Sequence, residues 1–324
     1  MATMPPQSQS WKSDRAVLFV HGIGNAKPGD YTPLVEQLQE ILGDDAKKIA
    51  FYFLYYDQVN DWFADKLQAA NGIASLVQIV RGKLDTSDLS NVVADVVGDV
   101  IWPVLIADAR QAVRAAILQQ LEQIVLDGKK AGFQPRSQHL TIIAHSLGCF
   151  HVYEAMWAAC ADPAQGLGPA SAGVRLDNLI FMASPVQLIG TVAKSMGKAV
   201  PQRDTLFSVS QPIAIPTEPG DGGQPIPCAR RTISISGNLD PVGGYFFRDK
   251  LDWAYMALDG QLAFIDEEQV ASVNGNERAT LTSIFQSALQ NQGPPTITPN
   301  NPHDWSAYIQ RHASDLKSWI TEAV

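Results

Sequence analysis

Short apolar runs alternate along this sequence with longer stretches whose apolar residues recur at helical spacing. The short runs are rich in β-branched and aromatic side chains and are bounded by charged residues or glycine, which is typical of buried strands. We therefore predict strands at 16–20, 49–56, 139–144, 178–183 and 231–236.

Helical spacing fills most of the segments between those runs. Leucine and isoleucine residues recur at the period of a helix between Pro33, which suits a first turn, and Gly43, which suits a helix end. Residues 147–160 and 304–323 show the same pattern. Because strands joined by crossover helices run parallel, the order of elements predicts an α/β fold with a mainly parallel central sheet and helices on both faces.

The stretch from 61 to about 130 contains no strand-like run and carries three apolar stripes at helical spacing. Its last part, from about Val104, is expected to be the crossover helix before the third strand. Residues 61–103 exceed what a crossover needs, so we predict a helical insertion there. It is either a cap over an apolar substrate pocket or an ordinary packed segment, within a single domain that spans residues 1–324.

The pentapeptide A-H-S-L-G at 144–148 ends a strand-like run and opens a helix-like one. A nucleophile elbow needs this context, because it holds a serine on a sharp turn between a strand and a helix. The residues two before and two after the serine must be small, and Ala144 and Gly148 satisfy that condition. Ser146 is therefore the candidate nucleophile, and the alternative is a serine that only caps the helix.

A second motif, F-V-H-G-I-G at 19–24, directly follows the first predicted strand. With this motif the sequence resembles the α/β-hydrolase family, in particular its lipase and esterase members. The resemblance implies that the backbone N–H groups of Ile23 and Leu147 form an oxyanion hole, in which each donor contributes roughly 3 to 4 kcal/mol. Without the downstream serine, the motif would favour a glycine-rich turn or an anion-binding loop.

The segment S-G-N-L-D-P-V at 236–242 follows the last strand-like run and supplies a candidate acid. It resembles the acid loop of the same family, which implies that Asp240 accepts an imidazole N–H and stabilises the imidazolium. Asp-Pro is also an ordinary turn initiator, which is the alternative.

A histidine must act as the base, and the sequence has six. Those at positions 21, 139, 145 and 151 lie within or beside the elements described above, so none is placed to reach Ser146 from a separate loop. His312 falls in helix-patterned sequence, whereas His303 lies in the loop before that helix. We therefore predict His303 as the base, and the chain order Ser146, Asp240, His303 matches that of the α/β-hydrolase triad.

The resemblance extends from about Ala16 to Tyr308 and implies an α/β-hydrolase fold with a helical insertion. It further implies a serine hydrolase that cleaves carboxylic esters through an acyl-enzyme. Two features depart from the family pattern: Ala144 replaces the first glycine of the elbow, and no clear strand lies between Asp240 and His303. The alternatives are a non-catalytic binding protein of the same fold, and a thioesterase or peptidase with the same triad.

Composition narrows the partners and cofactors. With 324 residues, 46% of them hydrophobic, the chain can build a core without disulfide or metal support. The net charge of −9 disfavours nucleic acid and anionic membranes as partners. The resemblance to lipases and esterases implies a small-molecule ester or lipid-like substrate. Oligomeric state is left open.

The three cysteines have no metal-ligand spacing, and neither a complete dinucleotide fingerprint nor a phosphate-loop lysine motif is present. We therefore expect no cofactor and no metal. The sequence has no apolar h-region near residue 1 and no run of 18 apolar residues, so we expect no transmembrane segment and a cytoplasmic location.

Overall fold

The protein is described here from a computed structural model, in which residues 7–22, 29, 31–56, 107–161, 176–185, 214–215, 226–227, 229–237, 261–267 and 305–322 are described. The strands are β1 (Arg15–Val20), β2 (Ala50–Leu54), β3 (His139–His145), β4 (Leu176–Met182), β5 (Ala214–Ile215), β6 (Ile226–Pro227), β7 (Ala229–Gly237) and β8 (Gln261–Glu267). The helices are α1 (Thr32–Leu42), α5 (Ala107–Lys130), α6 (Leu147–Ala161), α11 (Trp305–Arg311) and α12 (Ala313–Thr321), with 3₁₀ turns at Gly43–Lys48 and Pro135–Ser137.

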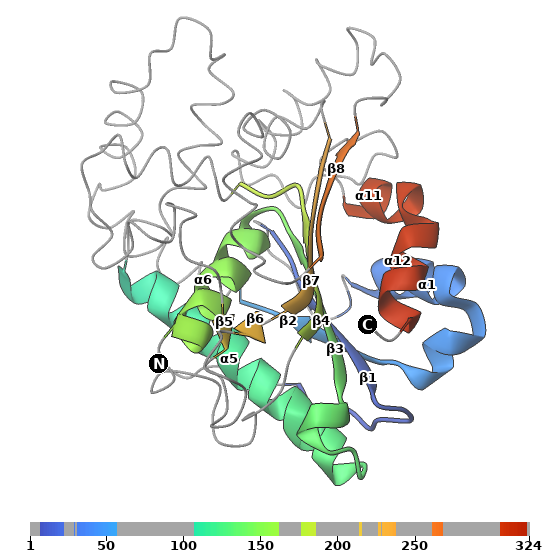
Figure 1. Cartoon of the computed structure of the whole chain (residues 1–324), viewed down its shortest axis with the longest axis horizontal. Coiled ribbons are helices and arrows are strands. Elements are labelled where there is room, and N and C mark those ends of the chain that lie inside the picture. The colour runs from blue at the N-terminus through green and yellow to red at the C-terminus, as the bar shows by residue number, and fades with distance from the viewer. Residues whose placement is uncertain are drawn as a thin grey trace, which may run out of the picture.

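Six strands form one sheet in the order β2-β1-β3-β4-β7-β8, and every pairing between neighbours is parallel. The register brings the carboxyl ends together at one edge, because Val20 lies opposite both Leu54 and Ala144, and Met182 lies opposite Ile235. The predicted α/β class with a parallel sheet is confirmed. Figure 1 shows α5 and α6 on one face of this sheet and α1, α11 and α12 on the other.

Two apolar cores lie on the two faces, because successive side chains of a strand point to opposite sides. In β1, Leu18 and Val20 belong to the core beneath α5 and α6, whereas Val17 and Phe19 belong to the core beneath α1, α11 and α12. All four side chains are buried. A strand buried on both faces reads as a continuous apolar run, which is why A-V-L-F-V could be recognised from the sequence.

The crossover helices fall close to where helical spacing placed them. Helix α5 begins at Ala107 and leads into β3, as expected for the last part of the stretch from 61 to about 130. Gly43 closes α1 with a φ of 62°, a conformation that favours glycine. The insertion predicted at 61–103 lies outside the described residues, and the single-domain assignment to 1–324 stays a prediction.

Two parts of the chain differ from the sequence-based expectation. The strand β8, which adds the last position of the sheet beside β7, was missing from the predicted set. Its sequence Q-L-A-F-I-D-E has only four consecutive apolar residues and ends in two acids, so it lacks the pattern of a buried strand. The segment 211–227, whose five prolines favour a loop, contains the short antiparallel pair β5 and β6.

The C-terminal helix predicted at 304–323 is two helices, and α11 ends just before His312 while α12 begins just after it. His312 has φ −105° and ψ 27°, outside the helical range, and its side chain is buried. Tyr308, Ile309, Leu316 and Ile320 all reach the same core, so the bend keeps both helices against the sheet.

Residues 7–11, which precede β1, form a strap across the edge of the sheet. Strand β2 lies at the end of the strand order, and side chains of the strap bond its backbone: the Oε1 of Gln7 accepts the N–H of Phe53 at 2.8 Å, and Gln9 donates to the carbonyl of Phe51. The carboxylate of Asp127 on α5 then accepts the N–H of Gln9 at 2.8 Å. These bonds satisfy backbone groups that an edge strand otherwise presents to other chains.

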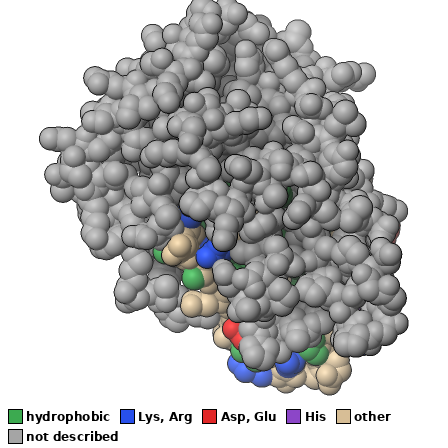
Figure 2. All heavy atoms as spheres, turned by 60° about the vertical axis from the view of Figure 1, so that its left-hand side comes forward, with side chains coloured by type: hydrophobic (Ala, Val, Ile, Leu, Met, Phe, Trp, Pro, Cys, Tyr) green, Lys and Arg blue, Asp and Glu red, His purple; other side chains and the backbone are tan. Residues whose placement is uncertain are grey.

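Charged side chains gather at the opposite end from the carboxyl edge. Figure 2 shows Lys and Arg side chains on the surface at the lower end of the molecule, where α5 ends in Figure 1. Lys129, Lys130 and Arg136 are exposed in this part of the chain.

Among the described helices, none has both the length and the apolar character needed to cross a membrane.

Candidate active site

Ser146 sits in the turn between β3 and α6 with a left-handed backbone conformation, at a φ of 52°. A residue other than glycine rarely adopts this conformation, which costs of order 1 to 3 kcal/mol and is held only where the surroundings impose it. The N–H of Ser146 donates to the carbonyl of Met182 at 2.9 Å, and its own carbonyl accepts the N–H of Cys149 at 3.0 Å. These two bonds fix the serine to the end of β4 and to the first turn of α6.

Gly148 allows α6 to begin against the end of β1. A Cβ at this position would lie 2.2 Å from the carbonyl oxygen of His21 and 2.5 Å from that of Val20. Real atoms do not approach so closely, so the turn requires glycine here. The sequence pattern predicted a small residue for close approach of backbones, and the close neighbour proves to be the backbone of β1 and the loop after it.

Gly22 brings that loop against Ser146. A Cβ on Gly22 would lie 2.6 Å from the Cβ of Ser146 and 3.0 Å from its Oγ. The two motifs at 19–24 and 144–148, more than a hundred residues apart in sequence, therefore meet at Ser146. This contact is what an oxyanion loop needs, because its donors must lie close to the atom that the nucleophile attacks.

Leu147 is the first residue of α6 and its side chain is buried. The first N–H groups of a helix have no partner within the helix, and they carry the positive end of its dipole. An amide at this position, next to the serine, is suited to binding a negatively charged oxygen.

The other three predicted site residues, Ile23, Asp240 and His303, lie outside the described residues. Each is close in sequence to a described position at or near the carboxyl edge. Ile23 directly follows Gly22, Asp240 comes three residues after the end of β7, and His303 comes two residues before the start of α11.

Helix α11 begins beside the elbow. The ring of Trp305 lies 6.0 Å from the ring of His145, the residue before the nucleophile, and Tyr308 lies 6.4 Å from the same ring. On its other side Trp305 packs edge-on against Tyr31, at 5.3 Å. This aromatic contact fixes the start of the C-terminal helices to the edge that carries Ser146.

The described histidines other than His145 lie at distinct places. His139 begins β3, at the opposite edge from Ser146, and its Nδ1 lies 2.5 Å from a carboxylate oxygen of Asp177. His312 lies at the junction of α11 and α12, with its Nδ1 3.5 Å from a carboxylate oxygen of Asp315. His21 lies in the loop after β1, buried against the ring of Tyr56.

His151, on α6, is an uncharged buried imidazole. Burial, together with the smaller effects of the nearby His21 and Arg110, lowers its pKa to about 3. Neither ring nitrogen has a hydrogen-bond partner among the described residues. Beside it, burial also lowers the pKa of the Arg110 guanidinium, whose Nε lies 3.6 Å from a carboxylate oxygen of Glu154.

Tyr56 was not recognised as a site residue from the sequence. It follows β2, and its hydroxyl donates to the carbonyl oxygens of His21 at 2.6 Å and of Gly22 at 2.9 Å. In the sequence it is the last residue of the run I-A-F-Y-F-L-Y-Y, where an aromatic residue indicates a strand. A tyrosine placed where a strand ends is the signal that could have identified it.

A second strained residue marks the neighbouring strand end. Ala183 follows β4 with a φ of 53°, and its N–H donates to the carbonyl of Ile235 on β7 at 3.0 Å. Ser146 and Ala183 thus lie at the ends of adjacent strands, and strained residues of this kind cluster at active sites.

Within the described chain, no group of three or more His, Cys, Asp or Glu side chains is arranged as metal ligands.

A parallel α/β sheet with a serine on a strained strand-to-helix turn at its carboxyl edge is the arrangement of the α/β-hydrolase fold. Comparison of the sequence with models of known families gives no match, and neither does comparison with curated proteins. Among solved structures the chain is similar to esterase B from Lactobacillus rhamnosis, at 13% identity over 88% of this chain and 79% of that one, with a TM-score of 0.39.

Two further solved structures show a likeness of the same degree. TT1662 from Thermus thermophilus is 10% identical over 98% of this chain and 92% of that one, with a TM-score of 0.39. An esterase/lipase from an uncultured bacterium is 12% identical over 87% and 79%, with a TM-score of 0.35. Likenesses this distant do not bear on the reaction, and the assignment of the fold rests on the sheet and the elbow.

Proposed function

We propose that this protein is a serine hydrolase that cleaves carboxylic esters, with lipid-like esters favoured, through a Ser146–His303–Asp240 triad. Ser146 Oγ attacks the ester carbonyl while His303 takes the hydroxyl proton, which it then gives to the departing alcohol. Asp240 orients His303, and the amides of Ile23 and Leu147 bind the oxyanion. Water attacks the acyl-enzyme by the same route and releases the acid.

The observation that carries this proposal is the left-handed Ser146 with the Gly22 backbone against its Oγ. A serine that only caps a helix has an extended backbone, typically in the β region, and requires no neighbouring loop. Ser146 differs from such a cap in both respects. Its φ is 52°, and the loop at Gly22 packs so closely that a Cβ there would lie 3.0 Å from its Oγ. The arrangement fits a nucleophile better than a cap.

The positions of Asp240 and His303 in the chain support their proposed roles. Strand β7 lies two places from β3 in the sheet and ends three residues before Asp240. Neighbouring strands are about 4.8 Å apart, so the end of β7 is roughly 10 Å from that of β3. His303 is joined by two peptide units to Trp305, which packs against His145 beside the nucleophile.

Covalent labelling tests the nucleophile directly. A fluorophosphonate probe reacts with an activated serine whatever the substrate is, so we expect it to label the wild-type protein and to fail with Ser146→Ala. Ser184→Ala is the matched control, because Ser184 is also buried and follows the neighbouring strand β4. Absence of labelling in the wild-type protein would favour a non-catalytic binding protein, and labelling retained in Ser146→Ala would assign another serine.

The base is tested by comparing two histidines. We expect His303→Ala to lower kcat by several orders of magnitude with little change in thermal midpoint, and His312→Ala to leave kcat within a few fold. The wild-type kcat/KM should rise with pH through one apparent pKa near that of histidine, because only the neutral imidazole accepts the serine proton. The reverse mutational pattern would transfer the role to His312.

The acyl preference follows from the predicted insertion at 61–103, which we propose borders the acyl pocket as a cap. Each CH₂ buried contributes ~0.8 kcal/mol, so a series of p-nitrophenyl esters from acetate to longer chains should show kcat/KM rising by tens of fold. A flat or falling series would indicate a small-ester site and a purely structural insertion.

A further inference from the structure

The hydroxyl of Tyr56 contacts the loop that packs on the nucleophile. It lies 2.6 Å from the carbonyl oxygen of His21 and 2.9 Å from that of Gly22, so the two carbonyls share its single proton in a bifurcated hydrogen bond. Tyr56 comes from the chain after β2, whereas the two carbonyls belong to the chain after β1, the neighbouring strand. One side chain therefore joins the carboxyl ends of two strands where the loop leaves the sheet.

The ring of Tyr56 is held from two sides. It stacks on the ring of His21, with the centroids 4.4 Å apart and the planes at 12°, and it meets the ring of His151 edge-on at 5.2 Å. Only 1% of the residue is exposed. Because the ring cannot rotate away without breaking both contacts, its hydroxyl is a fixed point for the loop backbone.

The bond to Gly22 determines more than the position of one carbonyl. The carbonyl of Gly22 and the N–H of the next residue, Ile23, belong to one planar peptide unit, and in a trans peptide the oxygen and the hydrogen point in opposite directions. By holding the oxygen of Gly22, Tyr56 restricts how this rigid peptide unit can rotate. The Cα that begins this peptide unit is the one that packs on Ser146.

We infer that Tyr56 is a positioning residue that orients the oxyanion-hole amide of Ile23 through the carbonyls of His21 and Gly22. This inference rests on the proposed function, since it assigns Tyr56 a role in the same site. The hydroxyl of Tyr56 acts through the loop backbone, because the atoms that it bonds are the carbonyl oxygens of His21 and Gly22. An oxyanion donor must lie 2.7 to 3.1 Å from the developing charge, so a small rotation of the peptide unit reduces transition-state binding.

The variant Tyr56→Phe keeps the ring and its stacking on His21 and removes only the hydroxyl. We expect kcat for a p-nitrophenyl ester to fall about tenfold to a hundredfold, with KM within about twofold of the wild-type value, because the loss appears mainly in the transition state. The rate of fluorophosphonate labelling should fall in parallel. The apparent pKa of the kcat/KM profile should not move, because the base is untouched.

Tyr52→Phe is the matched control. Tyr52 is also buried, lies four residues earlier on β2, and loses comparable hydrogen bonds: its hydroxyl accepts from Trp11 at 2.7 Å and donates to Asp127 at 3.0 Å. These partners lie away from Ser146, so Tyr52→Phe should lower the thermal midpoint and leave kcat per folded molecule within twofold. Equal kcat losses in the two variants would show a general effect of stability and would overturn the inference.

A second pair of replacements distinguishes the loss of the hydrogen-bond donor from an effect on folding. At position 56, 4-aminophenylalanine keeps a donor at the end of the ring, whereas 4-fluorophenylalanine fills the same space and donates nothing. We expect kcat, measured per active site by titration, to be largely kept with the amino ring and lost with the fluoro ring. Equal kcat values for the two would overturn the role of the hydroxyl.

The outcomes also separate this inference from the proposed function. A wild-type protein that neither labels at Ser146 nor cleaves esters would contradict the proposed function itself. A wild-type protein that does both, together with Tyr56→Phe at the wild-type kcat, would leave the hydrolase intact and refute only the role of Tyr56.

Discussion

Two glycines determine how closely the loop after β1 and the start of α6 approach each other. A Cβ on Gly148 would meet backbone carbonyl oxygens, at 2.2 and 2.5 Å, whereas a Cβ on Gly22 would meet the side chain of Ser146. The carbonyls of Val20, the last residue of β1, and of His21 belong to the main chain, which yields less readily than a serine side chain. The same substitution should therefore have different consequences at the two positions.

We expect Gly22→Ala to give folded protein whose kcat/KM is reduced about a hundredfold or more, because the methyl group displaces the loop or the nucleophile. Gly148→Ala should instead lower the thermal midpoint steeply or prevent folding, because the carbonyls of Val20 and His21 would have to move. Ester hydrolysis and thermal denaturation of both variants check this. An active Gly22→Ala protein would show that the loop can shift without consequence.

His151 illustrates a residue whose burial is costly. Its pKa of about 3 means that the native protein leaves the imidazole neutral, while the unfolded chain binds a proton below about pH 6.5. Stability is therefore lost as the pH falls from about 6.5 towards 3. Each ring nitrogen also lacks a partner among the described residues, and an unpaired buried polar group costs ~1–3 kcal/mol.

The variant His151→Leu, of similar size, should consequently be at least as stable as the wild-type protein at pH 7.5, and increasingly more stable as the pH is lowered to 4.5. Thermal midpoints measured across that range test the expectation. His139→Leu is the contrasting variant, because His139 has a close carboxylate partner in Asp177 and should lose stability on substitution. A His151→Leu protein that is less stable at every pH would contradict the argument.

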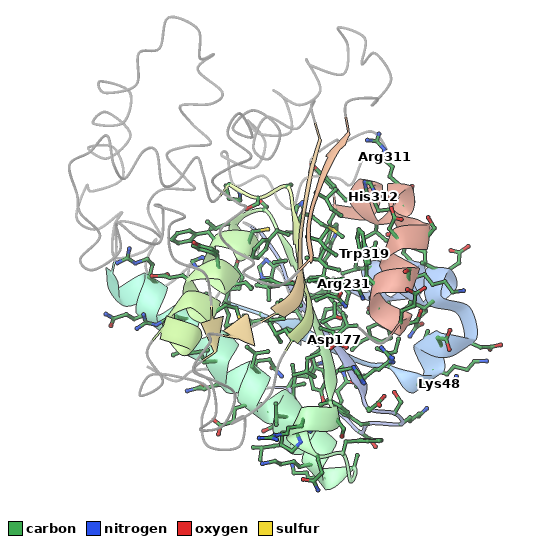
Figure 3. The ribbon with its side chains drawn as sticks, viewed as in Figure 1. Lys48, Asp177, Arg231, Arg311, His312 and Trp319 are labelled. Atoms are coloured by element: carbon green, nitrogen blue, oxygen red, sulfur yellow. The ribbon has the colours of Figure 1, made fainter. Side chains whose placement is uncertain are left out.

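At the scale of secondary structure, α12 is tied to the sheet by a buried polar network. The Nδ2 of Asn178 on β4 donates to the carbonyl of Trp319 at 2.5 Å and to the Oγ1 of Thr141 at 2.8 Å. Arg231 on β7 donates from Nε to the Oδ1 of Asn178 at 2.8 Å, and from its guanidinium to the Trp319 carbonyl at 3.0 Å. Figure 3 shows Arg231 and Trp319 on facing elements.

Burial lowers the pKa of Arg231, and the charges of Asp177 and Glu322 oppose that shift. Because this cation is buried, removing its acceptor should cost more than an ordinary hydrogen bond. We expect Asn178→Leu to reduce the free energy of unfolding by ~2–4 kcal/mol. The double variant Asn178→Leu/Arg231→Met should recover part of that loss in urea denaturation, and strict additivity of the two single variants would contradict a shared network.

The elements that the sequence predicted well are those with a strong apolar period. Apolar runs that are buried on both faces, such as Ala16–Val20 and His139–Ala144, were correctly predicted as strands. Strand β8 was missed because it has an acidic end and few β-branched residues, and its pairing with β7 is a long-range contact without a local signal. The break at His312 was missed because the apolar stripe continues through it, from Ile309 to Leu316.

At the scale of the whole molecule, the strap formed by residues 7–11 connects β2 to α5. Asp127 accepts hydrogen bonds from the N–H of Gln9, the Oγ of Ser8 and the hydroxyl of Tyr52. Burial raises the pKa of this carboxyl, but the hydrogen bonds from Gln9, Ser8, Gln123 and Tyr52 outweigh burial and the net shift is downward. Its contribution to stability is therefore present above the unfolded value, about 3.8, and is lost as the pH falls through the lowered native value.

We expect Asp127→Asn to lower the thermal midpoint at pH 7, and we expect the difference from the wild-type protein to shrink as the pH falls below about 3.8 and the wild-type carboxyl takes up a proton through its lowered native pKa. Asp44→Asn is the control, because the side chain of Asp44 is exposed and its ion-pair partner, Lys47, is exposed as well. Light scattering on Asp127→Asn should also rise, since a loosened strap uncovers the edge of β2. An unchanged midpoint at pH 7 would show that the strap is held by its other bonds.

The strap and the Tyr56 contact have a common reason for being absent from the sequence-based description. Both depend on polar side chains that bond the backbone of a distant segment, as Gln7 bonds Phe53 and Tyr56 bonds His21. Such bonds follow from the tertiary structure and leave no periodic pattern in the sequence. The strand-to-helix turn at Ser146, the candidate nucleophile, was recognisable because its small neighbours, Ala144 and Gly148, are local in sequence.

The contact between Gly22 and Ser146 also has a stereochemical consequence. In the proposed mechanism, the acyl group approaches the Oγ of Ser146 from the side away from Gly22, because a Cβ on Gly22 would lie only 3.0 Å from that oxygen. The carbonyl carbon or phosphorus atom of the substrate therefore meets the Oγ in one orientation. A site of this shape distinguishes mirror images, so a chiral phosphonate should react through one enantiomer far faster than through the other.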